Sequence, residues 1–333
     1  MIENRILLSI AIPTYNRSSN LQTLYEDFIG IVEKKCSGNI EIIICDNSDK
    51  KDAKRNQNIF SQTSIRYFKN KKNIGFTNNV IQCFKRAKGE FLWIISDDDI
   101  LNPDHFLNFL EKLEDISQSN HDCIMLPFLN SDGLGREYVS NDNDTWNVQE
   151  TSSLVEIMNK NNQFPFVLFS SAIIRLNNFD QDKIKAIRNQ FEGNDYIQIP
   201  LFIEAIGLDA KIYFYDDILI EYNASKDIRF DIKKMMFSMK DIINYYLSDN
   251  KKSKKRYLKR YYRSYVGLYL LHKASLYKVR GVESFKKVLI SELRDCISLN
   301  NLFLTGLIFF PAIILRTFFR INQFFLIKRN QSL

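Results

Sequence analysis

The most constraining feature of this chain is the alternation of short, apolar, β-rich runs with segments of helical length. Three such runs are residues 7–12, 40–45 and 91–95. The segments between them carry apolar residues at helical spacing, bounded by residues that start or stop helices. This alternation predicts an α/β layer fold with a largely parallel sheet flanked by helices.

Each of the three runs ends in polar residues. The clusters are Pro13, Thr14, Tyr15 and Asn16; Asp46, Asn47 and Ser48; and Asp97, Asp98 and Asp99. In open α/β sheets, ligands bind beyond the carboxyl ends of the strands. Polar residues after strands can be ordinary loops. Acids at two strand ends and a tight loop at a third favour one shared crevice.

Three consecutive carboxylates at the end of a buried strand repel one another unless a cation lies between them. Closely spaced carboxylate oxygens suit Mg²⁺ or Mn²⁺, which commonly share their coordination with substrate phosphates. The alternative is a solvated acidic turn in which Asp98 or Asp99 caps the next helix. No dinucleotide fingerprint or P-loop is present, so phosphate binding would go through a metal.

Composition points to a folded protein of a reducing compartment. The 333 residues are 45% hydrophobic and contain few Gly or Pro, which excludes extensive disorder. Five cysteines without C-x-x-C spacing predict reduced thiols, and three dispersed histidines argue against a zinc site. Because residues 1–12 lack the pattern of a signal peptide, we expect a cytoplasmic protein.

The net charge of +7 hides a division along the chain. Residues 1–230 hold 25 basic and 33 acidic side chains, whereas residues 231–333 hold 21 basic and 6 acidic ones. We therefore expect a main domain over residues 1–230 and a basic, helical region over residues 231–333. A net charge of +15 in that region indicates an anionic partner, either membrane lipid or nucleic acid.

Two stretches of the basic region bear on that partner. Tyrosines recur every four residues at Tyr257, Tyr261, Tyr265 and Tyr269, beside a basic row of Lys255, Lys259 and Arg263. Such stripes suit an anionic membrane surface, or else a packing face beside a solvated face. Residues 297–315 carry no charge, which favours a helix lying in the membrane interface over a spanning helix or a buried oligomer contact.

Five motifs in the first 100 residues, taken together, resemble the family 2 glycosyltransferases with the GT-A fold. In order they are residues 8–17, 41–48, 73–79, 87–90 and 96–99. A weaker match at residues 191–196 has Asn194-Asp195 where the family usually has Glu-Asp. The residues of these motifs most resemble those of bacterial O-antigen and capsule transferases. Residues 130–190 carry no motif that we can interpret.

The resemblance implies transfer of a sugar, with inversion, from a nucleotide-sugar donor to a glycan acceptor. It also implies Mn²⁺ or Mg²⁺ as cofactor and a donor of the UDP or dTDP type. We expect a lipid-linked saccharide acceptor, and peripheral association of the basic region with the inner face of the cell membrane. We expect no nucleic-acid partner.

The same resemblance suggests roles for individual residues. Asp98 is the favoured metal ligand, with Asp97 and Asp99 as further candidates and Asp97 also facing the ribose. Ser96 stands where many relatives have Asp, which leaves the division of roles among the three open. Pro13, Thr14, Tyr15 and Asn16 would line the nucleoside, and Asp46 would accept a base N–H.

For three nearby residues, the sequence leaves two possible roles open. Asn73 and Asn79 either orient the donor or cap the helix near residue 77. Arg17 either contacts the donor or is an exposed residue at the start of a helix.

Asp195 is the predicted base that deprotonates the acceptor hydroxyl, with Glu192 in reserve. The structural alternative for Asp195 is a carboxylate at the start of a helix predicted over residues 196–206.

Two other functions remain open on the sequence. A catalytically silent scaffold would bind donor and metal without transfer; an acid at position 195 argues mildly against it. A nucleic-acid-binding protein would use the basic region, where interleaved tyrosines suit base stacking. The uncharged residues 297–315 fit that second alternative poorly.

Overall fold

The computed structural model describes residues 5–36, 38–130, 152–153, 166, 168–176, 180–222, 227–273 and 278–280. The chain divides into two compact units, which we describe separately. The first comprises Met1–Leu129, Glu137–Gly193 and Ile197–Asn223, and the second comprises Asn130–Arg136, Asn194–Tyr196 and Ala224–Leu333. The expected domain boundary at residue 230 stays a prediction, because contacts alone do not define separately folding parts.

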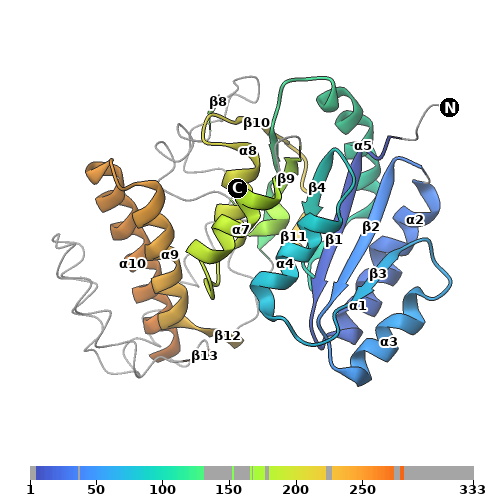
Figure 1. The fold of residues 1–333 in the computed structure, drawn as a ribbon, viewed down its shortest axis with the longest axis horizontal. Helices are drawn as coiled ribbons and strands as arrows, with labels where there is room; N and C mark the ends of the chain where they lie inside the picture. Colours follow the sequence, from blue (N-terminus) through green and yellow to red (C-terminus); the bar gives the residue numbers. More distant parts are fainter. Residues whose placement is uncertain are drawn as a thin grey trace, which may run out of the picture. The chain divides into compact units, whose positions relative to one another are not determined.

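Within the described residues, the first unit is built on an eight-stranded sheet of order β3-β2-β1-β4-β9-β6-β10-β8 (Figure 1). The strands are β1 (Leu8–Thr14), β2 (Ile40–Asp46), β3 (Arg66–Lys69), β4 (Phe91–Ile94), β6 (Cys123–Met125), β8 (Ser152–Ser153), β9 (Ala172–Arg175) and β10 (Lys211–Phe214). β9 and β8 run antiparallel to their neighbours, and the remaining pairs are parallel. The predicted α/β fold with a mostly parallel sheet is confirmed.

Helices connect these strands, as the alternation predicted. They are α1 (Ser18–Leu24), a π-helical turn (Tyr25–Ile29), α2 (Gly30–Lys35), α3 (Lys50–Phe60), α4 (Gly75–Arg86), α5 (Pro103–Ser117), a 3₁₀ turn (Phe169–Ser171), α7 (Gln181–Gln190) and α8 (Gln198–Ile206). A smaller sheet orders β5 (Ile100–Leu101), β11 (Ile220–Tyr222) and β7 (Phe128–Asn130).

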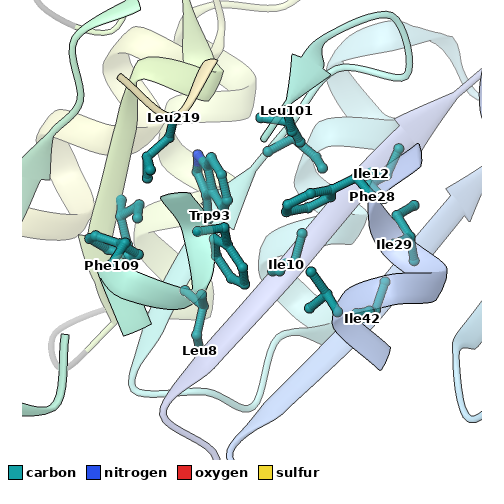
Figure 2. Close-up of a cluster of buried hydrophobic side chains, with 14 of the residues drawn as sticks. Leu8, Ile10, Ile12, Phe28, Ile29, Ile42, Trp93, Leu101, Phe109 and Leu219 are labelled. Atoms are coloured by element: carbon teal, nitrogen blue, oxygen red, sulfur yellow. The ribbon is translucent and has the colours of Figure 1, made fainter. Parts of the chain in front are cut away.

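The main core of the first unit lies on one face of the large sheet (Figure 2). Ile10 and Ile42 point to this face, since alternate residues of a strand share a side. They join an aromatic cluster in which the Trp93 and Phe106 ring centroids lie 5.6 Å apart. Burial of side chains this large contributes roughly 1.5–3 kcal/mol each and holds the strand ends in place.

Gly89 allows β4 to approach β1 closely. A Cβ at this position would lie 2.6 Å from the Ser9 backbone nitrogen, and the Gly89 N–H donates to Ser9 Oγ at 2.8 Å. Because backbone cannot move aside as a flexible side chain can, any larger residue would force the strands apart. Gly89 does not end the preceding helix, because α4 already ends at Arg86.

The start of α5 tests the interpretation of the acidic triplet as a helix cap. Asn102 caps α5, because its side chain accepts the N–H groups of Asp104 at 3.0 Å and His105 at 3.1 Å. The expectation that Asp98 or Asp99 could cap this helix is therefore wrong.

The first helix begins without a side-chain cap. Arg17 precedes α1 and makes no side-chain cap, while Ser18 Oγ donates to Asp52 at 3.0 Å. The π-helical turn separates α1 from α2, so the helical stretch over residues 18–35 is composed of three consecutive segments.

The second unit contains a pair of helices joined by residues 247–250, α9 (Ile232–Tyr246) and α10 (Lys251–Lys273), side by side in Figure 1. It also contains the paired strands β12 (Asp227–Asp231) and β13 (Lys278–Arg280). Asp231 caps α9 by accepting the Lys234 N–H at 3.0 Å. The helical character predicted from residue 231 onward is thus observed through residue 273.

The tyrosines of α10 form a packing face. Tyr257, Tyr265 and Tyr269 are buried, and the Tyr265 hydroxyl lies 3.3 Å from that of Tyr196. Their expected contact with a membrane surface is wrong, because the rings are enclosed by protein; the packing interpretation holds. No helix in the described part of the chain has the length and apolarity to cross a bilayer. Residues 297–315 lie outside the described residues.

Candidate active site

The three predicted clusters meet at one edge of the sheet in the first unit. β1 lies between β2 and β4, all three are parallel, and Thr14 is in register with Asp46. A backbone hydrogen bond joins the first two clusters, since the Asn47 N–H donates to the Thr14 carbonyl at 3.0 Å. The shared crevice predicted from the sequence therefore has its three components as neighbours.

Arg17 joins the first and third clusters. Its Nη1 donates to Asp97 Oδ1 at 2.8 Å and to Asp98 Oδ2 at 2.7 Å. Asp97 also accepts a hydrogen bond from Thr14 Oγ1 at 2.6 Å. The two carboxylates thus converge on one cationic atom, a contact that the sequence did not predict.

Asp97 and Asp98 differ in exposure. The Asp97 side chain is 4% exposed and that of Asp98 is 39% exposed. Burial raises the pKa of Asp97, although the hydrogen bond from Thr14 and the Arg17 charge act in the opposite direction. For Arg17, burial lowers the pKa, but Asp97 and Asp98 together outweigh it and the pKa is raised. Arg17 is therefore charged at every physiological pH.

Asp99 is anchored in the protein interior. Its Oδ2 accepts the Ser96 N–H at 2.8 Å and the Ser170 hydroxyl, and burial raises its pKa from 3.8 to about 7. Ser170 is held in turn by Trp93, whose Nε1 donates to the Ser170 carbonyl at 2.7 Å. Asp99 braces the acidic turn in this structure, and its predicted role as a metal ligand stays a prediction.

The carboxylate oxygens of the acidic turn are suitable ligands for a divalent cation. One oxygen of Asp97 and one of Asp98 lie within 2.8 Å of the same Arg17 nitrogen, so both point at a single cation position. Among the described residues, no group of three or more acidic, histidine or cysteine side chains could hold a metal. Two protein ligands are nevertheless typical of Mg²⁺ sites that are completed by water and substrate phosphates.

Asp46 is fully buried and has three hydrogen-bond donors. The Ser48 N–H lies 2.6 Å from Oδ1, Asn56 Nδ2 lies 2.9 Å from Oδ2, and the Tyr67 hydroxyl also donates to Oδ2. Burial and the bond to Asp46 raise the pKa of Tyr67. Asp46 therefore shapes the loop after β2, and its predicted contact with a base stays a prediction.

Buried asparagines connect the strand ends to α4. Asn79 Nδ2 donates to the Cys45 carbonyl at 2.8 Å, and its Oδ1 accepts from Asn70 at 2.9 Å. Asn73 Oδ1 accepts the Gly75 N–H at 2.8 Å, in a turn where Gly75 has a φ of +81° that favours glycine. The N-cap residue of α4 is Ile74, without a side-chain cap bond, so Asn73 shapes the turn before the helix and does not cap it. Asn79 lies within α4, so its predicted capping role is wrong; it links α4 to the end of β2, and donor contact by either residue stays a prediction.

The loop after β1 is held by its own side chains and leaves Tyr15 50% exposed. Asn16 adopts a φ of +53°, and its Oδ1 accepts the Asp49 N–H at 2.8 Å. The Asn16 N–H donates to Ser48 Oγ at 2.9 Å. Of the predicted nucleoside-lining residues, Tyr15 thus presents an exposed ring, whereas Thr14 and Asn16 organise the loop.

Asp195 belongs to the second unit. Its Oδ1 accepts from Lys234 Nζ at 2.5 Å, and its N–H donates to Ser238 Oγ at 3.1 Å. The helix that follows begins at Gln198, two residues later than predicted. Glu192, the reserve candidate, is exposed. The role of Asp195 as a base stays a prediction.

Sequence reasoning missed Ser170, Asn56, Tyr67 and Asn70, which hold the acidic turn and the β2 loop. Ser170 contacts Asp99 across 71 positions, and Tyr67 contacts Asp46 across 21. No local pattern marks such partners. A buried carboxylate signals only that donors must come from elsewhere in the chain.

The comparisons with known proteins agree with the sequence motifs. A family model, Glycosyl transferase family 2, matches residues 9–183, more than half of the chain. Abequosyltransferase RfbV of Salmonella typhimurium is 30% identical over 102 residues, which span 30% of this chain and only 30% of that protein.

Two solved structures resemble the chain at low identity. The mannosyltransferase PcManGT from Pyrobaculum calidifontis, solved with GDP-Man and Mn²⁺, has a TM-score of 0.51 at 11% identity, over 94% of this chain and 86% of that one. TarS of S. aureus has a TM-score of 0.48 at 15% identity, over 77% and 42% of the two chains. At 11% identity, the likeness to the mannosyltransferase concerns the fold alone. By its family match and its GT-A fold, the chain belongs to glycosyl transferase family 2.

Proposed function

We propose that this protein transfers a sugar from a nucleotide-sugar donor to a glycan acceptor in a metal-dependent reaction. The observation that carries the proposal is the convergence of Asp97 and Asp98 on one cation position. Asp97 is fixed there by a hydrogen bond from Thr14 at the end of β1. A family 2 chain with this acidic turn at the carboxyl edge of its sheet has the parts that such a reaction needs.

Asp98, the more exposed of the pair, would bind the metal directly, with Asp97 beside it. Bound there, Mn²⁺ or Mg²⁺ would neutralise negative charge on the diphosphate leaving group. Tyr15 supplies an exposed ring for the nucleoside, and the buried Asp46 keeps the neighbouring loop in shape. A donor of the UDP or dTDP type remains our proposal.

Inversion requires a base that removes the acceptor proton on the face opposite the leaving group. Asp195 is the proposed base. Lys234 contacts its Oδ1, and an ionised carboxylate has lone pairs on both oxygens, so this ion pair is compatible with accepting a proton.

We assign the acceptor to a lipid-linked saccharide of surface polysaccharide synthesis, such as O-antigen or capsule, reached at the inner face of the membrane. The start of α10 supports contact with anionic lipid. Lys251, Lys252 and Lys255 are exposed there, and the first turn contains no acid. Cations are unfavourable at a helix N-terminus, so an external anion would relieve this arrangement.

Vesicle flotation tests the membrane contact. Charge reversal of Lys251, Lys252 and Lys255 to Glu should weaken binding to phosphatidylglycerol vesicles. Reversal of the exposed Lys50, Lys51 and Lys54 of α3 should have little effect. Tight binding to an oligonucleotide, together with no binding to the vesicles, would favour the nucleic-acid alternative.

The transfer reaction itself is tested with purified protein, Mn²⁺ and a panel of nucleotide sugars, by measuring donor cleavage and product. Turnover that is lost in Asp98→Asn, with the fold retained, is the expected result. Retained turnover would refute the metal assignment. Donor binding without turnover for every acceptor offered would favour the silent scaffold.

A further inference from the structure

Arg17 occupies the position at which the two carboxylates of the acidic turn converge. A single nitrogen, Nη1, makes both contacts, at 2.8 Å to Asp97 and 2.7 Å to Asp98. Charge-assisted hydrogen bonds of this length are among the stronger polar contacts in proteins. Arg17 is therefore an integral part of the acidic turn.

The placement of Arg17 is costly without those carboxylates. It directly precedes α1, where the positive end of a helix disfavours a cation, and its side chain is only 34% exposed. Asp97 is almost fully buried, and a buried carboxylate requires a nearby positive charge or several donors. Arg17 and the acidic pair thus stabilise each other.

The oxygens that Arg17 contacts are those that a metal would use. Asp97 Oδ1 and Asp98 Oδ2 point at Nη1, while Asp97 Oδ2 accepts from Thr14 and Asp98 Oδ1 accepts from Ser96. A divalent ion bound by both carboxylates would lie where the guanidinium nitrogen lies, and the two cations would repel. Pairing with Arg17 and binding of a metal are therefore mutually exclusive.

We infer that Arg17 is a resident counter-ion of the Asp97–Asp98 pair, and that a divalent metal binds only when this guanidinium is displaced. The inference rests on the proposed metal-dependent function and adds a regulatory element to it. Arg17 lowers the apparent metal affinity, because only the fraction of molecules with the guanidinium withdrawn can bind. Once withdrawn, Arg17 is a cation available for the diphosphate of the donor.

Mn²⁺ binding is the first test, with free Mn²⁺ measured by electron paramagnetic resonance in the presence and absence of UDP. Arg17→Gln should bind Mn²⁺ about five- to tenfold more tightly than the wild type, the effect expected when a half-buried ion pair no longer competes. Arg55→Gln is the matched control. It removes the same charge from an exposed pair with Asp52 and should leave the affinity unchanged.

Chemical labelling of the wild-type protein is the second test and needs no variant to fold. Phenylglyoxal modifies accessible guanidinium groups, and its rate of reaction with Arg17 can be followed by peptide mass spectrometry. Saturating Mn²⁺ should accelerate labelling of Arg17 and leave that of Arg55 unchanged.

The outcomes separate this inference from the proposed function. If Mn²⁺ binds to the wild type and to Arg17→Gln with equal strength, or more weakly to the variant, Arg17 does not compete and the inference is overturned while metal dependence stands. Bound Mn²⁺ with no change in Arg17 labelling overturns it equally. If Mn²⁺ binds to neither protein, with or without UDP, both the inference and the proposed metal dependence fail.

Discussion

Asp46 ends one buried strand and Asp98 follows another strand of the same sheet, yet their surroundings differ. Asp46 is fully buried and accepts hydrogen bonds from Ser48, Asn56 and Tyr67. Asp98 is 39% exposed and is contacted by Arg17 and Ser96. Both positions looked equally functional in the sequence. The comparison teaches that the donors around a carboxylate, and not its place after a strand, determine whether it can serve a ligand.

The strongest expected effect is on catalysis at Asp98. Asp98→Asn should lower the transfer rate by about 10²–10³-fold, the range seen when one electrostatic contact to a transition state is removed. The melting temperature should change little, because the side chain is partly exposed. Steady-state kinetics and thermal unfolding of the same preparation check both parts. A large loss of stability in this variant would remove the contrast with Asp46.

Asp99 extends the comparison to a carboxylate that is buried with fewer donors. Its pKa is raised from 3.8 to about 7, so the unfolded chain releases this proton at a lower pH than the folded protein. The stabilising contribution is complete below pH 4 and is lost as the pH rises towards 7. Relative to Asp99→Asn, the wild type should lose about 4 kcal/mol of unfolding free energy across this window, at 1.36 kcal/mol for each unit of pKa.

Urea unfolding of both proteins from pH 4 to pH 8, in buffer containing a chelator, measures this difference. Parallel stability curves would show that Asp99 titrates normally. The ionisation of Asp99 would then make no contribution of its own to the pH dependence of stability.

Removing the Asp46 carboxylate should act on stability first. Asp46→Ala leaves the Ser48 N–H, Asn56 and Tyr67 without their acceptor in a buried site, which should lower the unfolding free energy by about 2–3 kcal/mol. Denaturant unfolding checks the value. A variant as stable as the wild type, but unable to bind donor, would mean that Asp46 is a binding residue after all.

The smallest expected effect comes from removing one donor at a time. Tyr67→Phe should cost about 1 kcal/mol of unfolding free energy, because Asp46 keeps its other two donors. The same substitution at the exposed Tyr15 should leave stability unchanged. Equal effects at the two positions would show that the Asp46 site is less tightly organised than its contacts indicate.

Much of the fold could be predicted, because its signals are local. The apolar runs of β1, β2 and β4 and the polar residues that follow them are visible in any window of a few residues. The parallel arrangement follows from their alternation with helices. Placing the three clusters at one edge needed no further information. The alternative in which Asp98 or Asp99 caps α5 is wrong, because several polar residues near a helix start can all serve as caps and Asn102 does so here.

The partners within the site could not be predicted. Arg17 pairs with residues 80 and 81 positions away, and Ser170 comes from a stretch with no interpretable motif. The tyrosine stripe of α10 is a related case. Its spacing showed that one face of the helix is aromatic, but only the packed second unit shows that this face is enclosed by protein.

Residue types and their order were sufficient for the family, the sheet and the cluster of acids at its edge, because these depend on short-range periodicity and on adjacent strands. The tertiary structure decided which acid is buried, which is braced and which faces a cation. The physical reason is that the state of a carboxylate depends on solvation and on donors within about 3 Å, and the chain supplies those donors from distant positions.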